Sequence, residues 1–173
     1  MRVRLSAVIV GLVALGLSAC GTSSSGTSSS SPTSAKIDTA FTTKVGQMCS
    51  TNLEDFPAVG KFPYADFNPR NPNPSELPAV GTYFAQNQRG DGALESAIRE
   101  LGEPATGANA WNRVRAAALE FLSNAEAQAT DAQASNTTAF VSAVGRNEAI
   151  SKELMSAAKQ AGLPLTGACA QLF

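Results

Sequence analysis

Apolar residues recur every three or four positions over most of the chain after residue 36, and this spacing is typical of one buried face of an α-helix. Between Lys36 and Asp55, for example, the stripe consists of Ile37, Phe41, Val45 and Met48. Comparable stripes predict helices over residues 36–55, 75–88, 91–101, 109–135 and 136–161. The sequence leaves open whether residues 75–101 form two helices or one broken helix.

Residues that favour helix ends flank these stretches. Ser34, Ser75, Asp91 and Asn136 each precede an apolar stripe, where a short polar side chain caps the free N–H groups of a first turn. Gly162, followed two residues later by a proline, is a typical helix end. The pattern therefore predicts these four caps and a C-terminal end for the last long helix near residue 161.

Residues 57–75 interrupt the helical pattern with five prolines, which exclude a continuous helix there. The segment is nonetheless rich in rings, since Phe62, Tyr64 and Phe67 lie within it and Phe56 precedes it. A loop of this length in a small domain is unusual. We expect it to form a strap that lies across the helices and buries its rings.

The fold class that follows is all-α. Residues 109–161 are rich in alanine, glutamate, glutamine and arginine, which favour helix, and no stretch alternates cleanly between apolar and polar residues. A bundle of four or five helices with a proline- and aromatic-rich strap is the simplest packing for these stripes.

The first 20 residues have the organisation of an export signal. Arg2 and Arg4 precede an apolar run over residues 8–17, and small residues follow it. The motif Leu17-Ser18-Ala19-Cys20 resembles the lipobox of bacterial lipoproteins. This resemblance implies a signal peptide over residues 1–19, a diacylglyceryl group with acyl chains such as palmitate on Cys20, and a cell-membrane location on the extracytoplasmic face.

Residues 20–35 read as a lipidated tether to a single domain over residues 36–173. The stretch GTSSSGTSSSSPTS lacks apolar residues able to build a core, and such sequences behave as flexible coils. A tether of this length has a root-mean-square reach of roughly 20 Å. Its serines and threonines are also possible O-glycosylation sites.

The other two cysteines, Cys49 and Cys169, lie near the two ends of the predicted domain. Exported proteins mature under oxidising conditions, so the two thiols are predicted to form a disulfide that joins the ends of the domain. Two free thiols or a redox pair are the alternatives, but no local redox motif accompanies either cysteine.

Composition narrows the possible chemistry. The formal net charge of -1 gives no indication of a nucleic-acid partner. The chain has no histidine, which removes the commonest general base and metal ligand.

Asp91 and Glu95 are one helical turn apart, yet a cap and a solvated carboxylate explain them better than a cation site. Ser151 and Lys152 are adjacent on a predicted helix and point apart. We therefore expect no enzyme activity, cofactor or metal.

Outside the lipobox the layout resembles small exported α-helical lipoproteins of actinobacteria, which share a Ser/Thr-rich tether and two cysteines near the ends of the domain. The resemblance implies a non-catalytic binding or accessory module at the envelope, for an apolar ligand or a partner protein. A structural or surface envelope protein is the alternative, and an enzyme is the least favoured. Any ligand site is expected between the strap and the bundle, at Phe62, Tyr64, Phe67, Phe84 and Asn147.

Overall fold

The computed structural model describes residues 36–55 and 60–173, and in these ranges every regular element is a helix. The helices are α1 (Thr39–Asp55), α2 (Leu77–Asn87), α3 (Asp91–Glu100), α4 (Ala108–Gln133), α5 (Thr137–Ala161) and α6 (Cys169–Leu172). The all-α class and the bundle are confirmed. Residues 77–100 form two separate helices, which settles the alternative that the sequence left open.

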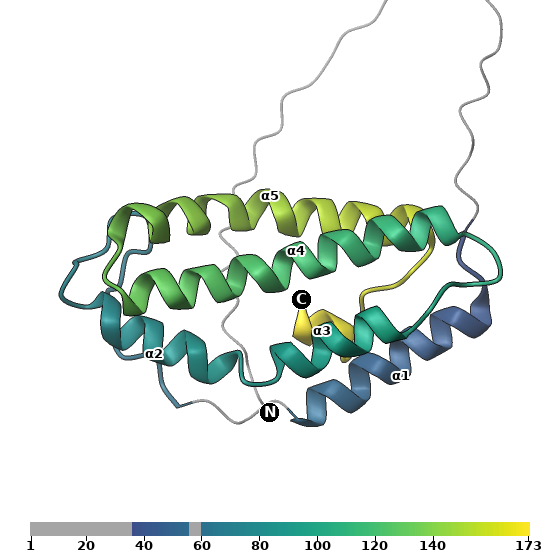
Figure 1. Cartoon of the computed structure of the whole chain (residues 1–173), viewed down its shortest axis with the longest axis horizontal. Helices are drawn as coiled ribbons and strands as arrows, with labels where there is room; N and C mark the ends of the chain where they lie inside the picture. The colour runs from purple at the N-terminus through teal and green to yellow at the C-terminus, as the bar shows by residue number, and fades with distance from the viewer. Residues whose placement is uncertain (1–35, 56–59) are drawn as a thin grey trace, which may run out of the picture. The chain divides into compact units, whose positions relative to one another are not determined.

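The two longest helices, α4 and α5, form a hairpin that organises the domain (Figure 1). Helices α2 and α3 follow one another along α4, and α1 packs beside α3 (Figure 1). Ser135 turns the chain between α4 and α5 at a positive φ of 55°. Alanines occupy many buried positions of this hairpin, and small side chains let two helix backbones approach closely.

The core has two adjoining parts. The larger part joins the apolar faces of α1, α3, α4 and α5 to the C-terminal residues. At its centre the rings of Phe41 and Trp111 meet edge to face with centroids 4.9 Å apart, and the indole N–H of Trp111 donates to the carbonyl oxygen of Gly102 at 2.9 Å. The smaller part lies under the strap and contains Leu77, Val80, Ala132 and Phe140.

Some of the expected helix caps are wrong. Helix α1 begins at Thr39, and the residue before it, Asp38, accepts a bond from the Phe41 amide at 2.8 Å, so Asp38 caps this helix. Ser75 does not cap α2, because Glu76 is the residue at the cap position, and the amide and hydroxyl of Ser75 both donate to Asn73 Oδ1. Asp91 is the first residue of α3 and follows Gly90 at the cap position.

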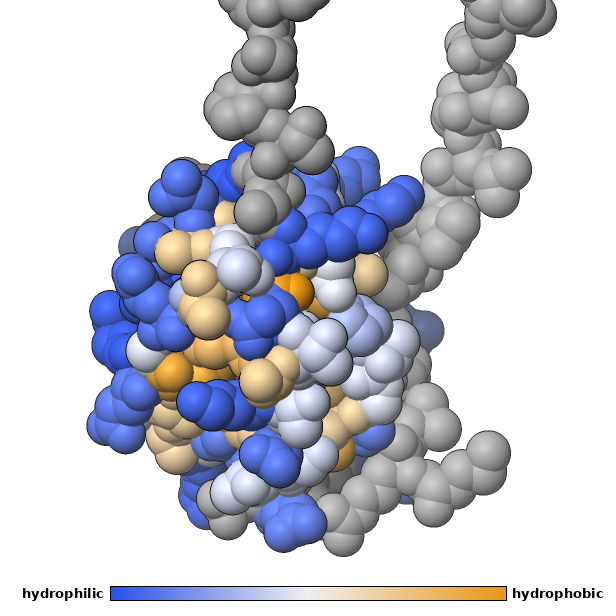
Figure 2. Space-filling view, turned by 90° about the vertical axis from the view of Figure 1, so that its right-hand side faces the viewer, coloured by the Kyte–Doolittle hydropathy of each residue, from blue (hydrophilic) through white to orange (hydrophobic). Residues whose placement is uncertain are grey.

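The cap of α5 and its end are confirmed. Asn136 Oδ1 accepts a bond from the amide of Ala139 at 3.3 Å. Gly162 follows the helix at a φ of 72°, the left-handed conformation that ends many helices. The side chain of Lys36 lies against Gly162. Figure 2 views the end of the domain where α5 ends and α1 begins, and hydrophobic surface lies there among hydrophilic surface.

Candidate functional site

The strap brings four of the five expected ligand residues together. Phe62 lies at the centre, with its ring centroid 5.5 Å from Phe67 and 6.2 Å from Phe84. Phe67 and Phe84 both contact the fully buried ring of Phe140 on α5, and Tyr64 packs against the same cluster. The strap rings are half-buried, so they cover the smaller part of the core as the sequence indicated.

The fifth expected residue, Asn147, belongs to a different feature. It lies on α5 facing α4, where its Oδ1 is 3.4 Å from Asn124 Nδ2 and 3.5 Å from Gln128 Nε2. Asn124 is buried, and its amide also donates to the carbonyl oxygen of Ala143 at 3.1 Å. This polar group fixes how the two long helices face each other, because any slip would leave a buried amide without partners.

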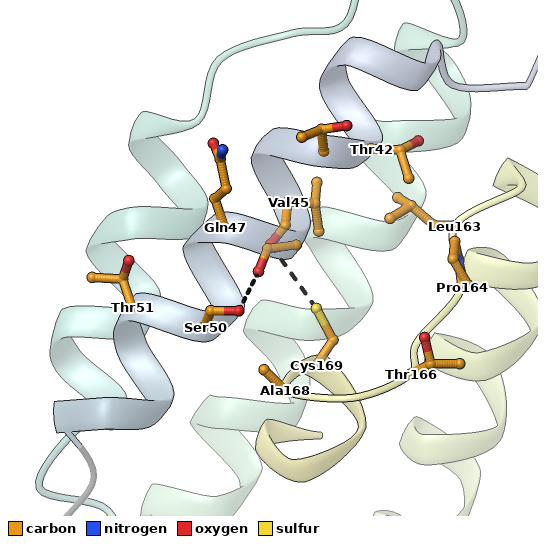
Figure 3. A pocket seen from close by; sticks show the side chains of 12 residues that line it. Thr42, Val45, Gln47, Ser50, Thr51, Leu163, Pro164, Thr166, Ala168 and Cys169 are labelled. Atoms are coloured by element: carbon orange, nitrogen blue, oxygen red, sulfur yellow. Dashed lines mark hydrogen bonds between the residues drawn. The ribbon is translucent and has the colours of Figure 1, made fainter.

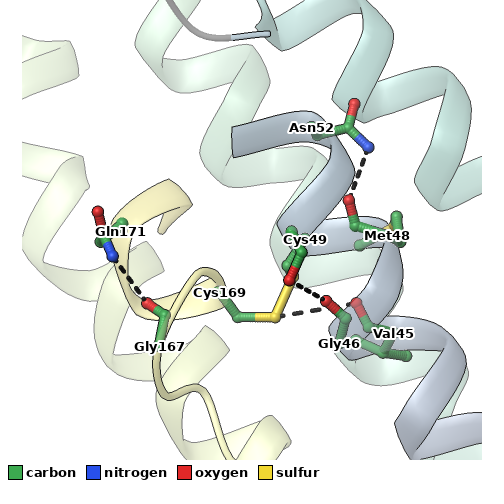
Figure 4. Close-up of a disulfide and its surroundings, with 9 residues drawn as sticks. Val45, Gly46, Met48, Cys49, Asn52, Gly167, Cys169 and Gln171 are labelled. Atoms are coloured by element: carbon green, nitrogen blue, oxygen red, sulfur yellow. Dashed lines mark hydrogen bonds between the residues drawn. A yellow bond between two sulfur atoms is a disulfide. The ribbon is translucent and has the colours of Figure 1, made fainter. Parts of the chain in front are cut away.

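The predicted disulfide between Cys49 and Cys169 is present, with the two Cα atoms 5.1 Å apart (Figure 4). Both residues are buried, and the bond joins α1 to the start of α6. Beside it, the Asn52 amide donates to the Met48 carbonyl at 2.9 Å. The disulfide therefore holds the C-terminal residues against α1, within the larger part of the core.

A groove of about 550 Å³ runs beside this disulfide, between α1 and the segment that leads into α6 (Figure 3). Its walls combine apolar side chains, such as Val45 and Leu163, with hydroxyl groups and an amide. The residues that line it are Thr42, Thr43, Val45, Gly46, Gln47, Ser50, Thr51, Leu163, Pro164, Thr166, Ala168 and Cys169.

A second hollow, of about 430 Å³, lies on the other side of Leu163 and Pro164. It is lined by Met155, Ala158, Lys159, Gly162, Leu163, Pro164 and Leu165. Sequence reasoning missed both hollows because it placed the site at the strap. The available signal was the Leu163-Pro164-Leu165 tripeptide, which puts apolar side chains directly after the predicted end of a helix.

The carboxyl groups of Asp38 and Glu148 have a lowered pKa, and both shifts have structural causes. The pKa of Asp38 is lowered first by the hydrogen bond from the Phe41 amide, and the amides of Thr106 and Ala105 lower it further. The pKa of Glu148 is lowered chiefly by the hydrogen bond from Lys152, whose Nζ lies 2.7 Å away. Arg70 of the strap lies 3.8 Å from the same carboxylate, so this pair also ties the strap to α5.

The other groups considered for chemistry have structural partners. Glu95 binds the guanidinium of Arg99 at 2.6 Å, one turn along α3. Lys152 is paired with Glu148, as described above. Within residues 36–55 and 60–173, no three acidic or cysteine side chains cluster as metal ligands would.

Cys20, the predicted lipidation site, lies outside the described residues, as do the predicted signal peptide and most of the predicted tether. None of the helices in the described ranges has the length and apolar character needed to cross a membrane. Comparisons of the chain with protein-family models, with curated proteins and with solved structures found no match.

Proposed function

We propose that the chain is an exported lipoprotein, held at the extracytoplasmic face of the cell membrane through a lipid on Cys20. The observation that carries this proposal is that two of the three cysteines are bonded to each other, which leaves Cys20 over. Cys49 and Cys169 are bonded to each other across a separation of 120 residues. Disulfides of this structural kind belong to oxidising compartments. The remaining cysteine is the one in the lipobox-like motif that follows the apolar run.

In this proposal the helical domain is a non-catalytic binding or accessory module for an apolar ligand or an envelope protein partner. Two features support it. The strap presents half-buried aromatic rings, and the groove beside Cys169 combines apolar walls with hydroxyl groups. Ligand sites commonly have this mixture of apolar walls and a few polar groups. A purely structural envelope protein would need neither feature.

The anchor is tested with a Cys20→Ala variant of the full chain and a matched Ser18→Ala variant. Ser18→Ala keeps a small residue beside the cleavage site and should still be processed. We expect the parent and Ser18→Ala to enter the detergent phase on partitioning, with an intact mass that includes the lipid. Cys20→Ala should keep its signal peptide or lose the lipid mass. Normal processing and partitioning of Cys20→Ala would contradict the anchor.

The binding role is tested by mass spectrometry of lipids and proteins that remain with the full chain after gentle detergent extraction from its native membrane. We expect one apolar molecule or one envelope protein to be retained by the parent and lost from a Phe62→Ala variant. A Thr138→Ala variant, changed at an exposed position, is the control. If the parent and Phe62→Ala retain equal amounts of the same molecule, the strap is not part of the binding site.

A further inference from the structure

An apolar strip lies at the end of the domain where the described chain begins. Met155 on α5 is 57% exposed, which makes it the large hydrophobic side chain that stands out from the surface of the described residues. Next to it, Leu163, Pro164 and Leu165 line the hollow of about 430 Å³. Figure 2 views this end of the domain and shows hydrophobic surface surrounded by hydrophilic side chains.

The tether joins the domain at this same end. The amide of Ile37 donates to the carbonyl oxygen of Ala161 at 3.0 Å, and the hydroxyl of Thr106 donates to the carbonyl oxygen of Lys36 at 3.3 Å. The side chain of Lys36 lies against Gly162. Met155 precedes the end of α5 by six residues, or about 9 Å along the axis. The chain therefore enters the domain beside the strip.

The charged side chain that lines the hollow is basic, and the nearby Asp38 carboxylate is turned toward the amides of residues 41, 105 and 106. Lys159 lines the hollow, and no acidic side chain does so among the residues that the structure describes there. Lys36 adds a second ammonium group through its contact with Gly162. Glu153 is two positions before Met155 and so lies on nearly the opposite side of α5. Lysine stems cover apolar surface while their ammonium groups reach outward, as they do at membrane interfaces.

We propose that this strip, made of Met155, Pro164 and Leu165 with Lys36 and Lys159 at its rim, docks on the anionic lipid surface to which the chain is anchored. The proposal rests on the anchor proposed at Cys20. A tether of residues 20–35 reaches roughly 20 Å, which keeps the strip at a millimolar effective concentration near the lipid, so even weak docking is populated.

A second copy of the chain fits the strip less well. A two-fold contact would place each patch against its copy and bring the rim lysines of both copies into one interface. An anionic lipid surface instead favours the docked orientation by about fivefold for each lysine brought near it. Met155, Leu165 and the rim lysines together therefore suit a lipid surface better than a copy of themselves.

The test uses the full lipidated chain, purified in detergent and reconstituted into vesicles of phosphatidylcholine and phosphatidylglycerol in about a 2:1 ratio. A Met155→Cys variant, labelled without reductant by an environment-sensitive fluorophore, reports the strip, because Cys49 and Cys169 are bonded. A Thr138→Cys variant carries the same label at an exposed position near the other end of α5, about 25 Å away. Spin-labelled lipid in the vesicles quenches a label that touches the membrane.

We expect the label at position 155 to be quenched several-fold more than the label at position 138. Adding Lys36→Glu and Lys159→Glu should reduce the quenching at 155 toward the level at 138. Flotation of the vesicles separates the two proposals. Protein that floats with vesicles but shows equal quenching at both positions overturns the docking and leaves the anchor intact. Protein that does not float overturns both.

A concentration-dependent blue shift of the 155 label without lipid, with no quenching in vesicles, would also overturn the docking. That result would assign the strip to contacts between copies of the chain. Strong quenching at position 155 that is unchanged by Lys36→Glu and Lys159→Glu would overturn the proposal that these two lysines attract the strip to anionic lipid.

Discussion

Replacing Gly81 by alanine should push α2 away from α4. A Cβ atom added at Gly81 would meet the backbone nitrogen of Gln133, and it would lie 2.8 Å from the carbonyl oxygen of Ala129. Both are backbone atoms of α4, so neither can rotate aside. Gly81 is itself buried, and Val80 beside it belongs to the smaller part of the core. The two helices must separate, and the core beneath the strap must loosen.

The magnitude follows from two opposing effects. Glycine to alanine inside a helix gains up to about 1 kcal/mol from backbone entropy. Overpacking a close contact costs about 1–3 kcal/mol, or more where backbone must shift. Because the atoms at Gly81 are backbone, we expect a net loss of about 2 kcal/mol. For a domain of this size, about 3 °C of melting temperature corresponds to 1 kcal/mol, so Gly81→Ala should lower it by about 6 °C.

Gly145 provides the matched control. It lies within α5 at an exposed position, and a Cβ atom there would meet nothing within 4 Å. Gly145→Ala should therefore raise the melting temperature by about 2–3 °C. Thermal unfolding followed by circular dichroism at 222 nm measures both variants. If Gly81→Ala is as stable as the parent, or changes in the same direction as Gly145→Ala, the close approach of α2 and α4 is wrong.

Three further predictions concern the disulfide, a carboxylate and the strap. Reduction of the disulfide between Cys49 and Cys169 should raise the intact mass by two hydrogen atoms. Because the bond closes a loop of 120 residues, its reduction should also lower the unfolding free energy by up to about 4–5 kcal/mol. Two alkylatable thiols in the unreduced protein would contradict the disulfide. Asp38 has a lowered pKa in the fold, so its carboxylate stabilises the protein above the ordinary value of 3.8 and this contribution is lost as the pH falls through the lowered pKa. The melting-temperature difference between the parent and Asp38→Asn should accordingly shrink on acidification. A difference that does not change with pH would show that the Asp38 carboxylate is not stabilised in the fold by these hydrogen bonds. Phe62→Ala should lower the unfolding free energy by about 2 kcal/mol in denaturant titrations, below the roughly 3–5 kcal/mol of a fully buried ring because this ring is only partly buried. Tyr64→Ala should cost less, and no loss of stability in either variant would mean that the strap does not cover the core.

The helices could be predicted from the sequence because their apolar stripes are long and regular. The Trp111 helix and the Phe140 helix each bury the face that the spacing indicated. The disulfide between Cys49 and Cys169 followed from the number and position of the cysteines rather than from any local pattern.

The parts that could not be predicted depend on contacts between distant residues. Asp38 caps α1 and also accepts bonds from residues 105 and 106, a combination that exists only once the chain is folded. Asn147 was predicted to contribute to a ligand site, and its contacts with Asn124 and Gln128 on α4 could not be predicted because these residues lie about 20 positions away in the sequence. The short helix α6 has four residues and carries no periodicity to recognise. The groove beside Cys169 could not be predicted because one of its walls is α1, which is distant in the sequence.

The bond between Cys49 and Cys169 also determines what a protease can release. Cutting the backbone once, anywhere between these two cysteines, leaves both pieces covalently joined, because the disulfide bridges the cut. This span includes the strap and both long helices. A single cleavage can therefore separate most of the domain from the residues that precede it only on the N-terminal side of Cys49, as long as the disulfide stays oxidised.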